Sequence, residues 1–119
     1  MKSQSTNPQL AALVLALRKR SRETKTPLYR RLAEDLCRSR RSQRRVNISK
    51  IARHTSEGSI VAVPGKVLSS GMLNHKLTIG AFKFSDRARI KIEKAGGRCI
   101  SLDTLAKENP GGTKIILLG

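Results

Sequence analysis

The segment Ile60-Val61-Ala62-Val63-Pro64-Gly65 indicates the fold class of this chain. Four consecutive apolar residues, most of them β-branched, are typical of a buried strand, and the Pro-Gly pair after them predicts a turn. A second apolar run, Leu77 to Phe82, follows an irregular loop around Ser69-Ser70-Gly71 and predicts another strand. Strands therefore begin after Gly58, where the helical spacing of the preceding residues stops.

Residues before Gly58 predict helices. Asn7-Pro8 is a helix start, and the next apolar residues share one helical face; they are Leu10, Leu13, Val14 and Leu17. Thr26-Pro27 opens a second helix with apolar residues at the same spacing up to Cys37. Asn47 is a third candidate cap, for a short helix that ends near Arg53-His54.

Residues 85–95 fit both a strand and a helix. The cap Ser85 and the stop signal Gly96-Gly97 favour the helix. A strand at 98–101, a helix at 102–108 and a strand at 114–118 complete an α/β pattern. We expect residues 1–54 to form a basic, mostly helical N-terminal region and residues 55–119 a small α/β core, integrated into one domain.

Positive charge dominates the composition. The 119 residues hold 25 Lys and Arg against 8 Asp and Glu, a formal net charge of +17. Residues 1–53 contain fifteen of the cations and three of the acids, a net of +12. Such a charge repels itself in a compact state, and binding to a polyanion relieves that repulsion. Arginine suits phosphate, so the arginine-rich first half indicates a nucleic-acid surface.

The segment 38–45, Arg-Ser-Arg-Arg-Ser-Gln-Arg-Arg, is the strongest functional feature. Its five arginines have no acid or apolar residue between them, so we expect contact with nucleic acid. Tyr29, Phe82 and Phe84 are the only aromatic residues. Proteins that hold unstacked bases use aromatic platforms, so this scarcity favours recognition of the backbone and shape of a folded RNA.

Other functions find little support. Pro64-Gly65-Lys66 resembles the end of a phosphate loop, but Ile60 and Val67 stand where the motif needs Gly and Ser or Thr. Residues 47–60 could be a fragment of a helix-turn-helix, the DNA-binding alternative. His54 and His75 lack partners at metal-ligand spacing, so no metal or other cofactor is expected. No catalytic arrangement is readable, so we expect neither an enzyme nor a small-molecule substrate.

The compartment follows from apolar and cysteine content. The longest apolar run, Leu10 to Leu17, is too short to span a bilayer, so no membrane partner is expected. Cys37 and Cys99 stand far apart in apolar contexts and are expected to be buried free thiols, although their redox state stays open. We expect an intracellular protein.

An ordered set of motifs resembles a known family. The motifs are Asn7-Pro8, Arg40-Arg41, Arg44-Arg45, Val46-Asn47, Lys50-Ile51, Val63-Pro64-Gly65-Lys66-Val67-Leu68, Phe84-Ser85, Ala95-Gly96-Gly97 and Asn109-Pro110. Over nearly the whole chain this set resembles the archaeal and eukaryotic "eighteen-e" protein of the large ribosomal subunit, which shares its core fold with the bacterial "fifteen" protein. The short length is similar to that of archaeal members. Tyr29 departs from the family pattern, in which tryptophan is expected.

The resemblance implies a small mixed core of irregular ββα turns and a cytoplasmic, ribosome-bound protein. Its partners would be large-subunit ribosomal RNA and neighbouring ribosomal proteins. The motif matches carry RNA binding onto Arg40, Arg41, Arg44, Arg45, Lys50 and Lys66. The basic helix ends and the arginine segment add Arg18, Lys19, Arg20, Arg22, Arg38 and Arg53. Replacing Arg44 by Ala is expected to weaken binding to all RNA sequences alike, because phosphate contacts carry little sequence information.

Overall fold

The structure, a computed structural model, describes residues 8–37, 44–109 and 114–118, and of residues 8–10, 37 and 44 the backbone only. Its elements in chain order are α1 (Pro8–Thr24), α2 (Pro27–Cys37), β1 (Arg44–Asn47), α3 (Ile48–Arg53), β2 (Ile60–Leu68), β3 (Thr78–Phe84), α4 (Asp86–Lys94), β4 (Arg98–Ser101), α5 (Leu102–Glu108) and β5 (Ile115–Leu117). The α/β class expected from the sequence is confirmed.

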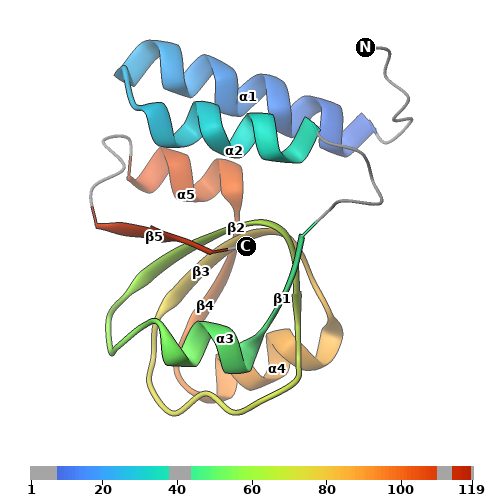
Figure 1. Ribbon diagram of the computed structural model, residues 1–119, viewed down its shortest axis with the longest axis vertical. Helices are drawn as coiled ribbons and strands as arrows, with labels where there is room; N and C mark the ends of the chain where they lie inside the picture. The colour runs from blue at the N-terminus through green and yellow to red at the C-terminus, as the bar shows by residue number, and fades with distance from the viewer. Residues whose placement is uncertain (1–7, 38–43, 110–113, 119) are drawn as a thin grey trace.

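The described strands form one parallel, five-stranded sheet in the order β1-β2-β3-β4, with β5 also paired to β2. β5 lies against residues 60–62 of β2, and β1 lies against residues 65–68. The two short strands therefore follow one another along the same edge of β2. Figure 1 shows that the sheet arches over α3 and α4, while α1, α2 and α5 stack above it.

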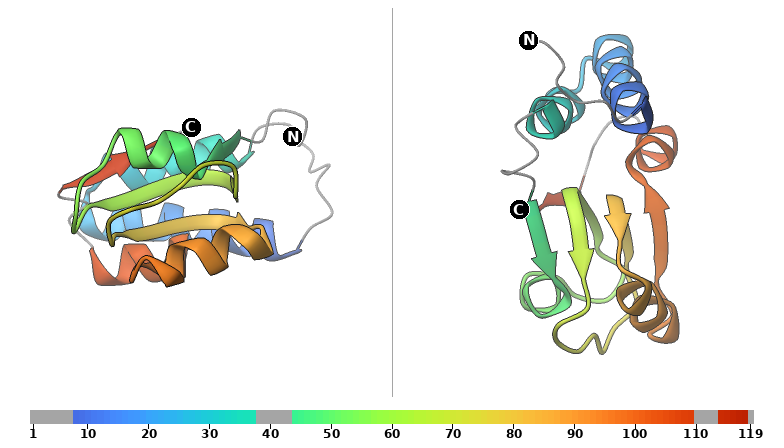
Figure 2. Two further views of the ribbon diagram at one scale, coloured as in Figure 1. Left: turned by 90° about the horizontal axis from the view of Figure 1, so that it is seen from below. Right: turned by 90° about the vertical axis from the view of Figure 1, so that its right-hand side faces the viewer.

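Two hydrophobic clusters lie on opposite faces of this sheet, because successive strand residues point to opposite sides. Val61 and Val63 of β2 pack in the cluster that includes α3 and α4. Ala62, between them, packs in the cluster that includes α1, α2 and α5. Figure 2 shows α3 and α4 together at one end of the molecule, opposite the end with α1 and α2. Helices thus cover both faces, as a parallel sheet requires.

Tyr29 links the helical hairpin to the far end of the chain. Its side chain is fully buried in α2, and its hydroxyl donates a hydrogen bond to the backbone oxygen of Asn109, after α5. Burial raises the pKa of the Tyr29 phenol above its usual value, and the nearby Arg20 opposes this shift. Leu17 of α1 is also fully buried in the same cluster. The N-terminal helices are therefore packed on the sheet.

The turn expected at Pro64-Gly65 is wrong. β2 runs through both residues to Leu68, and its register against β3 shifts by one residue between Val63 and Lys66. Proline lacks an N–H, so within a sheet it is tolerated at such an irregularity. Parallel pairing with β1, which begins beside Gly65, extends the strand past the point where the local sequence predicts its end.

Two helix starts have different outcomes. At α4 the Ser85 hydroxyl accepts a hydrogen bond from the Ala88 amide at 3.2 Å, so the cap predicted from the sequence is confirmed. Asn47 occupies the cap position of α3, but its side chain makes no cap hydrogen bond. Its Oδ1 accepts from the Ser70 amide instead, at 3.2 Å, and so ties α3 to the loop between β2 and β3.

Candidate nucleic-acid interface

Three cations lie side by side on three adjacent strands. Arg45 of β1 pairs with Lys66 of β2, and Lys66 pairs with Lys83 of β3. Neighbouring strands lie about 4.8 Å apart, so the three side chains leave the sheet close together. We call Arg45, Lys66 and Lys83 the cross-strand row.

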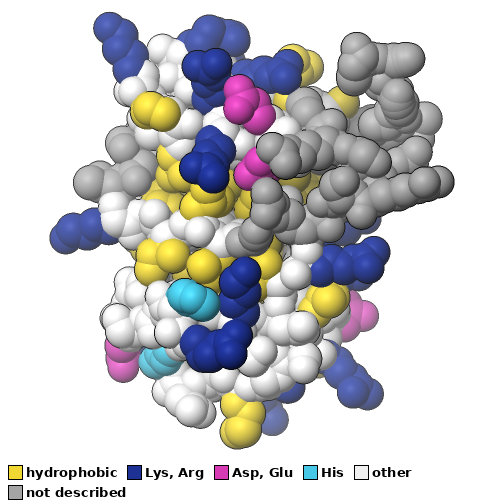
Figure 3. Space-filling view, in the orientation of Figure 1, with side chains coloured by type: hydrophobic (Ala, Val, Ile, Leu, Met, Phe, Trp, Pro, Cys, Tyr) yellow, Lys and Arg dark blue, Asp and Glu magenta, His cyan; other side chains and the backbone are white. Residues whose placement is uncertain are grey.

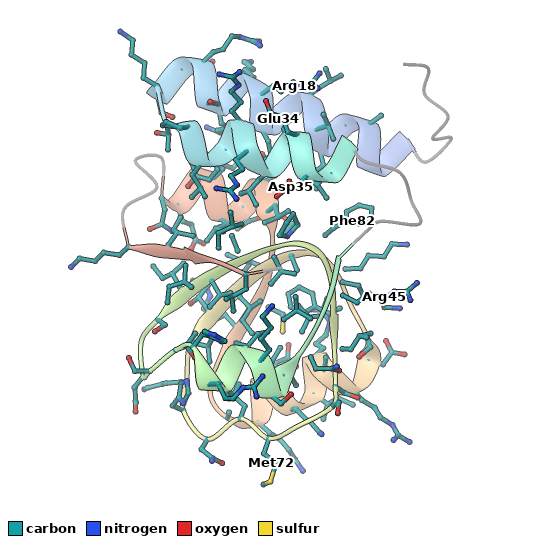
Figure 4. All side chains as sticks on the ribbon, in the orientation of Figure 1. Arg18, Glu34, Asp35, Arg45, Met72 and Phe82 are labelled. Atoms are coloured by element: carbon teal, nitrogen blue, oxygen red, sulfur yellow. The ribbon has the colours of Figure 1, made fainter. Side chains whose placement is uncertain are left out.

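The row points away from the core beside α3 and α4. The next residues along the three strands, Val46, Val67 and Phe84, are also register partners, and they pack in or against that core. Because side chains alternate between the faces of a strand, the three cations are directed to the other face. All three are exposed, and Figure 4 shows Arg45 extending outward from β1.

Within the described part of the chain, no carboxylate forms an ion pair with the row. Among the described residues, Arg45 and Lys66 have no ion-pair partner, and the Lys83 ammonium lies 5.5 Å from the centroid of the Phe82 ring. Like charges directly opposite one another on a sheet are destabilising. The row is thus a concentration of unneutralised positive charge that a bound anion would relieve.

Several acids of the chain are paired elsewhere. Glu34 contacts Arg30 at 3.2 Å on α2, and Asp103 contacts Lys107 at 3.5 Å on α5. Glu108 accepts two hydrogen bonds from Arg98, which lower the pKa of its carboxyl. These ion pairs are solvent-exposed and contribute little to stability. These three carboxylates are therefore engaged with cations outside the cross-strand row.

A second basic group lies at the C-terminal half of α1. Arg18, Lys19 and Arg22 are exposed there, whereas Arg20 is half-buried and lies near Tyr29. Figure 3 shows dark-blue side chains over α1 and α2 and a separate set lower on the same face, nearer the sheet and α3. Positive charge is therefore spread over both halves of the molecule.

A third basic group belongs to α3, where Lys50 is half-buried and Arg53 is exposed. Ile48 and Ile51 on the same short helix are fully buried and fix its orientation against β1 and β2. Core packing thus holds Lys50 and Arg53 in place. The structure therefore places these two RNA-binding candidates on the same short helix.

The arginine segment is only partly visible. Arg38, Arg40 and Arg41 lie outside the described residues, and of Arg44 only the backbone is described, paired with Gly65. The chain enters β1 at Arg44, so the segment leads directly into the cross-strand row. β1 itself is not foreseen from the sequence, because among its described side chains, those of residues 45–47, only Val46 is buried.

The positions of two lysines, Lys66 and Lys83, could not be predicted correctly from the sequence. Lys66 was expected on a turn, and it lies instead inside β2. Lys83 is missing from the predicted interface altogether. Its flanking residues, Phe82 and Phe84, signal a strand, but only the register of β2 against β3 shows that it lies beside Lys66.

The alternatives noted from the sequence fit less well. The segment between Arg53 and Ile60 forms turns and leads into β2, so no second helix of a helix-turn-helix follows α3. Pro64 and Gly65 lie within a strand and form no phosphate loop. Within the described ranges, no three His, Cys, Asp or Glu residues come together as a metal site, and no helix is long and apolar enough to cross a membrane.

The thiol of Cys99 is free and partly buried against the core beside α4. Burial raises its pKa, so the thiol stays protonated and unreactive near neutral pH. This agrees with the expectation of a free thiol at Cys99. The side chain of Cys37 lies outside the described part of the structure.

Comparison with known proteins gives consistent matches along the whole chain. A sequence profile of the family described as "Ribosomal protein 60S L18 and 50S L18e" matches residues 1–119. "Large ribosomal subunit protein eL18" of Methanococcus maripaludis is 38% identical over 117 residues, which cover 98% of each chain. The protein of the same name from Methanothermobacter thermautotrophicus is 47% identical over 105 residues, covering 88% of this chain and 87% of its own. The one from Methanosphaerula palustris is 42% identical over 113 residues, covering 95% and 93%. This chain therefore belongs to the ribosomal protein family of 60S L18 and 50S L18e.

Proposed function

We propose that this chain is a structural constituent of the large ribosomal subunit that binds ribosomal RNA mainly through phosphate contacts. The cross-strand row is the observation that supports this mechanism most directly, because three exposed cations stand together without an acid. Phosphate oxygens between them would replace repulsion by attraction. As a member of this family the chain is not an enzyme.

The basic groups on α1 and α3 extend the interface beyond the row. Arg18, Lys19, Arg20 and Arg22 lie on the helical hairpin, and Lys50 and Arg53 lie on the other side of the sheet. Arg38, Arg40, Arg41 and Arg44 join the hairpin to β1 along the chain. We infer that the protein bridges phosphates of separate RNA segments, with the sheet as a rigid spacer.

Recognition by shape follows from the aromatic residues. Tyr29 is fully buried, and Phe82 and Phe84 are only half-exposed, with Lys83 and Arg89 over their rings. Unstacked bases would need an open aromatic face. The interface therefore suits the backbone of folded RNA better than a single strand.

The proposal extends to the partners, the location and the domain organisation of the chain. We infer that neighbouring ribosomal proteins also contact the chain, and that the ribosome containing it is cytoplasmic. We further propose that residues 1–54 and 55–119 form one integrated unit. Buried residues from both parts share a cluster, as Leu17 and Leu105 do, which supports that view.

Sucrose-gradient sedimentation of a tagged copy in its native cell tests the proposal. We expect the chain to travel with the large subunit at moderate salt and to be released as salt rises, since phosphate contacts weaken with salt. A chain that stays at the top of the gradient, or that follows chromosomal DNA, would contradict the proposal.

A further inference from the structure

Two histidines lie at the C-terminal end of α3, and both are fixed by hydrogen bonds that use only one ring nitrogen. His54 is the residue that ends the helix, and its Nδ1 lies 2.9 Å from the backbone oxygen of Lys50. A carbonyl oxygen can only accept, so Nδ1 of His54 holds the proton and donates. The Nε2 atom of this exposed ring has no partner among the described residues.

The ring of His75 is held through its other nitrogen, Nε2. The Thr55 hydroxyl donates a hydrogen bond to the backbone oxygen of Ile51 at 2.7 Å. The hydroxyl proton is therefore not available for a second hydrogen bond. His75 Nε2 lies 2.8 Å from the same hydroxyl oxygen and must donate to it. The Nδ1 atom of His75 is left without a partner within the described part of the chain.

The loop that carries His75 is hydrogen-bonded to α3 near its start and to the turn after α3 near its end. The Ser49 amide donates to the Ser70 backbone oxygen at 2.9 Å near the start of the loop. The Gly58 amide donates to the Lys76 backbone oxygen at 2.8 Å near its end. His54 and His75 therefore belong to one rigid unit with α3.

The charges around this unit favour an anion. Lys50 and Arg53 lie on α3 itself, and Lys76 follows His75. Glu57, in the turn after α3, is the acid of this region. β1 and β2, which pack against α3, face it with apolar residues of the core, such as Val46 and Val61. Cations thus outnumber the acid on the exposed side.

We propose that His54 and His75, with Lys50 and Arg53, form a second phosphate-binding site at the C-terminal end of α3, which holds RNA phosphate when the rings are protonated. In each ring one N–H already donates a hydrogen bond to the protein, so only the other nitrogen is available to an anion. That nitrogen carries a proton, and can donate it to an anion, only when the ring is an imidazolium. RNA binding at this site is then coupled to proton uptake.

The inference rests on the proposed RNA binding and can be separated from it experimentally. Binding of the full chain to a transcript of large-subunit ribosomal RNA is measured at constant salt at about pH 8 and about pH 5.5, where imidazole changes charge. The chain has only two histidines. We expect affinity to rise by about two- to fivefold for each ring that gains a phosphate partner, the range of an exposed ion pair.

The variant His54→Gln/His75→Gln keeps an N–H donor at each position and cannot be protonated in this range. It retains every other titratable group of the chain, so it is the matched control. We expect it to bind RNA at pH 8 like the wild type and to lose most of the gain at low pH. Each single variant should lose about half of that gain.

Nuclear magnetic resonance of the ring protons provides an independent readout. On addition of the same RNA near neutral pH, the Cε1 proton signals of both histidines should move toward those of the protonated ring. Binding at pH 8 without a change at low pH, or an equal change in the double variant, would overturn this site and leave the proposed function standing. Absence of RNA binding at both pH values would overturn both.

Discussion

Arg45 and Lys66 are direct partners across two adjacent parallel strands, although both side chains are cations and both are exposed. Lys83 continues the pairing on the next strand. A sheet normally avoids like charges directly opposite one another, because they destabilise it. The cross-strand row therefore destabilises the free protein locally, and under the proposed function RNA phosphate would relieve this repulsion.

Neutralising the central cation should stabilise the free protein. Lys66→Gln removes the charge that repels both Arg45 and Lys83, so we expect the free energy of unfolding to rise by about 0.2–1 kcal/mol at low salt. Added salt should shrink the difference, because it screens exposed charges. Urea denaturation at two salt concentrations measures both effects. A loss of stability at low salt would show that the row is not repulsive.

Lys83 should contribute to RNA binding although the sequence alone does not mark it. Lys83→Gln should lower the affinity for large-subunit ribosomal RNA and reduce the slope of log K against log salt by roughly 0.7–0.9, the value of one phosphate contact. Lys107→Gln is the matched control, because Lys107 lies on α5 and contacts Asp103. Equal slopes for the Lys83 and Lys107 variants would remove Lys83 from the interface.

The phenol of Tyr29 should titrate above its ordinary range. It is the only tyrosine, so the ultraviolet absorbance of tyrosinate reports this residue alone. Burial raises its folded-state pKa above 10.0. Stability contributed by the neutral phenol is therefore complete below pH 10 and is lost as pH rises through the folded-state pKa. A midpoint at or below 10 in the folded protein would contradict its burial.

Tyr29→Phe isolates the hydrogen bond to Asn109. The variant keeps the buried ring and removes the hydroxyl that donates to the Asn109 backbone oxygen. We expect a loss of about 0.5–1.5 kcal/mol in the free energy of unfolding at neutral pH. Its stability should also lack the additional decline of the wild type above pH 10. Urea denaturation at neutral and alkaline pH compares the two proteins.

Gly80 allows α5 to approach β3 closely. A Cβ atom at this position would lie 2.8 Å from Leu105 Cδ2 and 3.0 Å from Leu105 Cβ, which is too close for either atom to stay in place. Gly80→Ala should therefore lower the free energy of unfolding by about 1–3 kcal/mol, the usual cost of overpacking a core. Chemical denaturation measures the loss. An unchanged midpoint would mean that α5 is free to move away from the sheet.

Much of the fold could be predicted because its signals are local. The apolar face with Val14 and Leu17 marks α1, and the Ser85 cap with the Gly96-Gly97 stop marks α4. Features that depend on strand pairing could not be predicted this way. Pro64-Gly65 is a turn signal in sequence, yet pairing of β1 beside Gly65 keeps it within β2.

The same distinction between local signals and strand pairing applies to the residues of the candidate site. Arg45, Lys50 and Lys66 could be predicted, because motifs and local charge mark them. Lys83 could not, because a single lysine between two phenylalanines is ordinary in a strand, and its place beside Lys66 follows only from the strand register. His75 joins α3 through a contact with Thr55, twenty residues earlier in the chain. Sequence thus identifies charged segments, and the sheet determines which charges meet.

The salt dependence of RNA binding in a variant without the cross-strand row shows whether these three cations contact phosphate. Arg45→Gln/Lys66→Gln/Lys83→Gln is compared with wild type and with Lys107→Gln, on the same transcript of large-subunit ribosomal RNA. If the row neutralises RNA phosphates, the slope of log K against log salt should fall by about 2–3 units, since each of the three contacts contributes roughly 0.7–0.9. A slope equal to that of the wild type would show that these three cations do not contact RNA, and would contradict the proposal that the row binds phosphate.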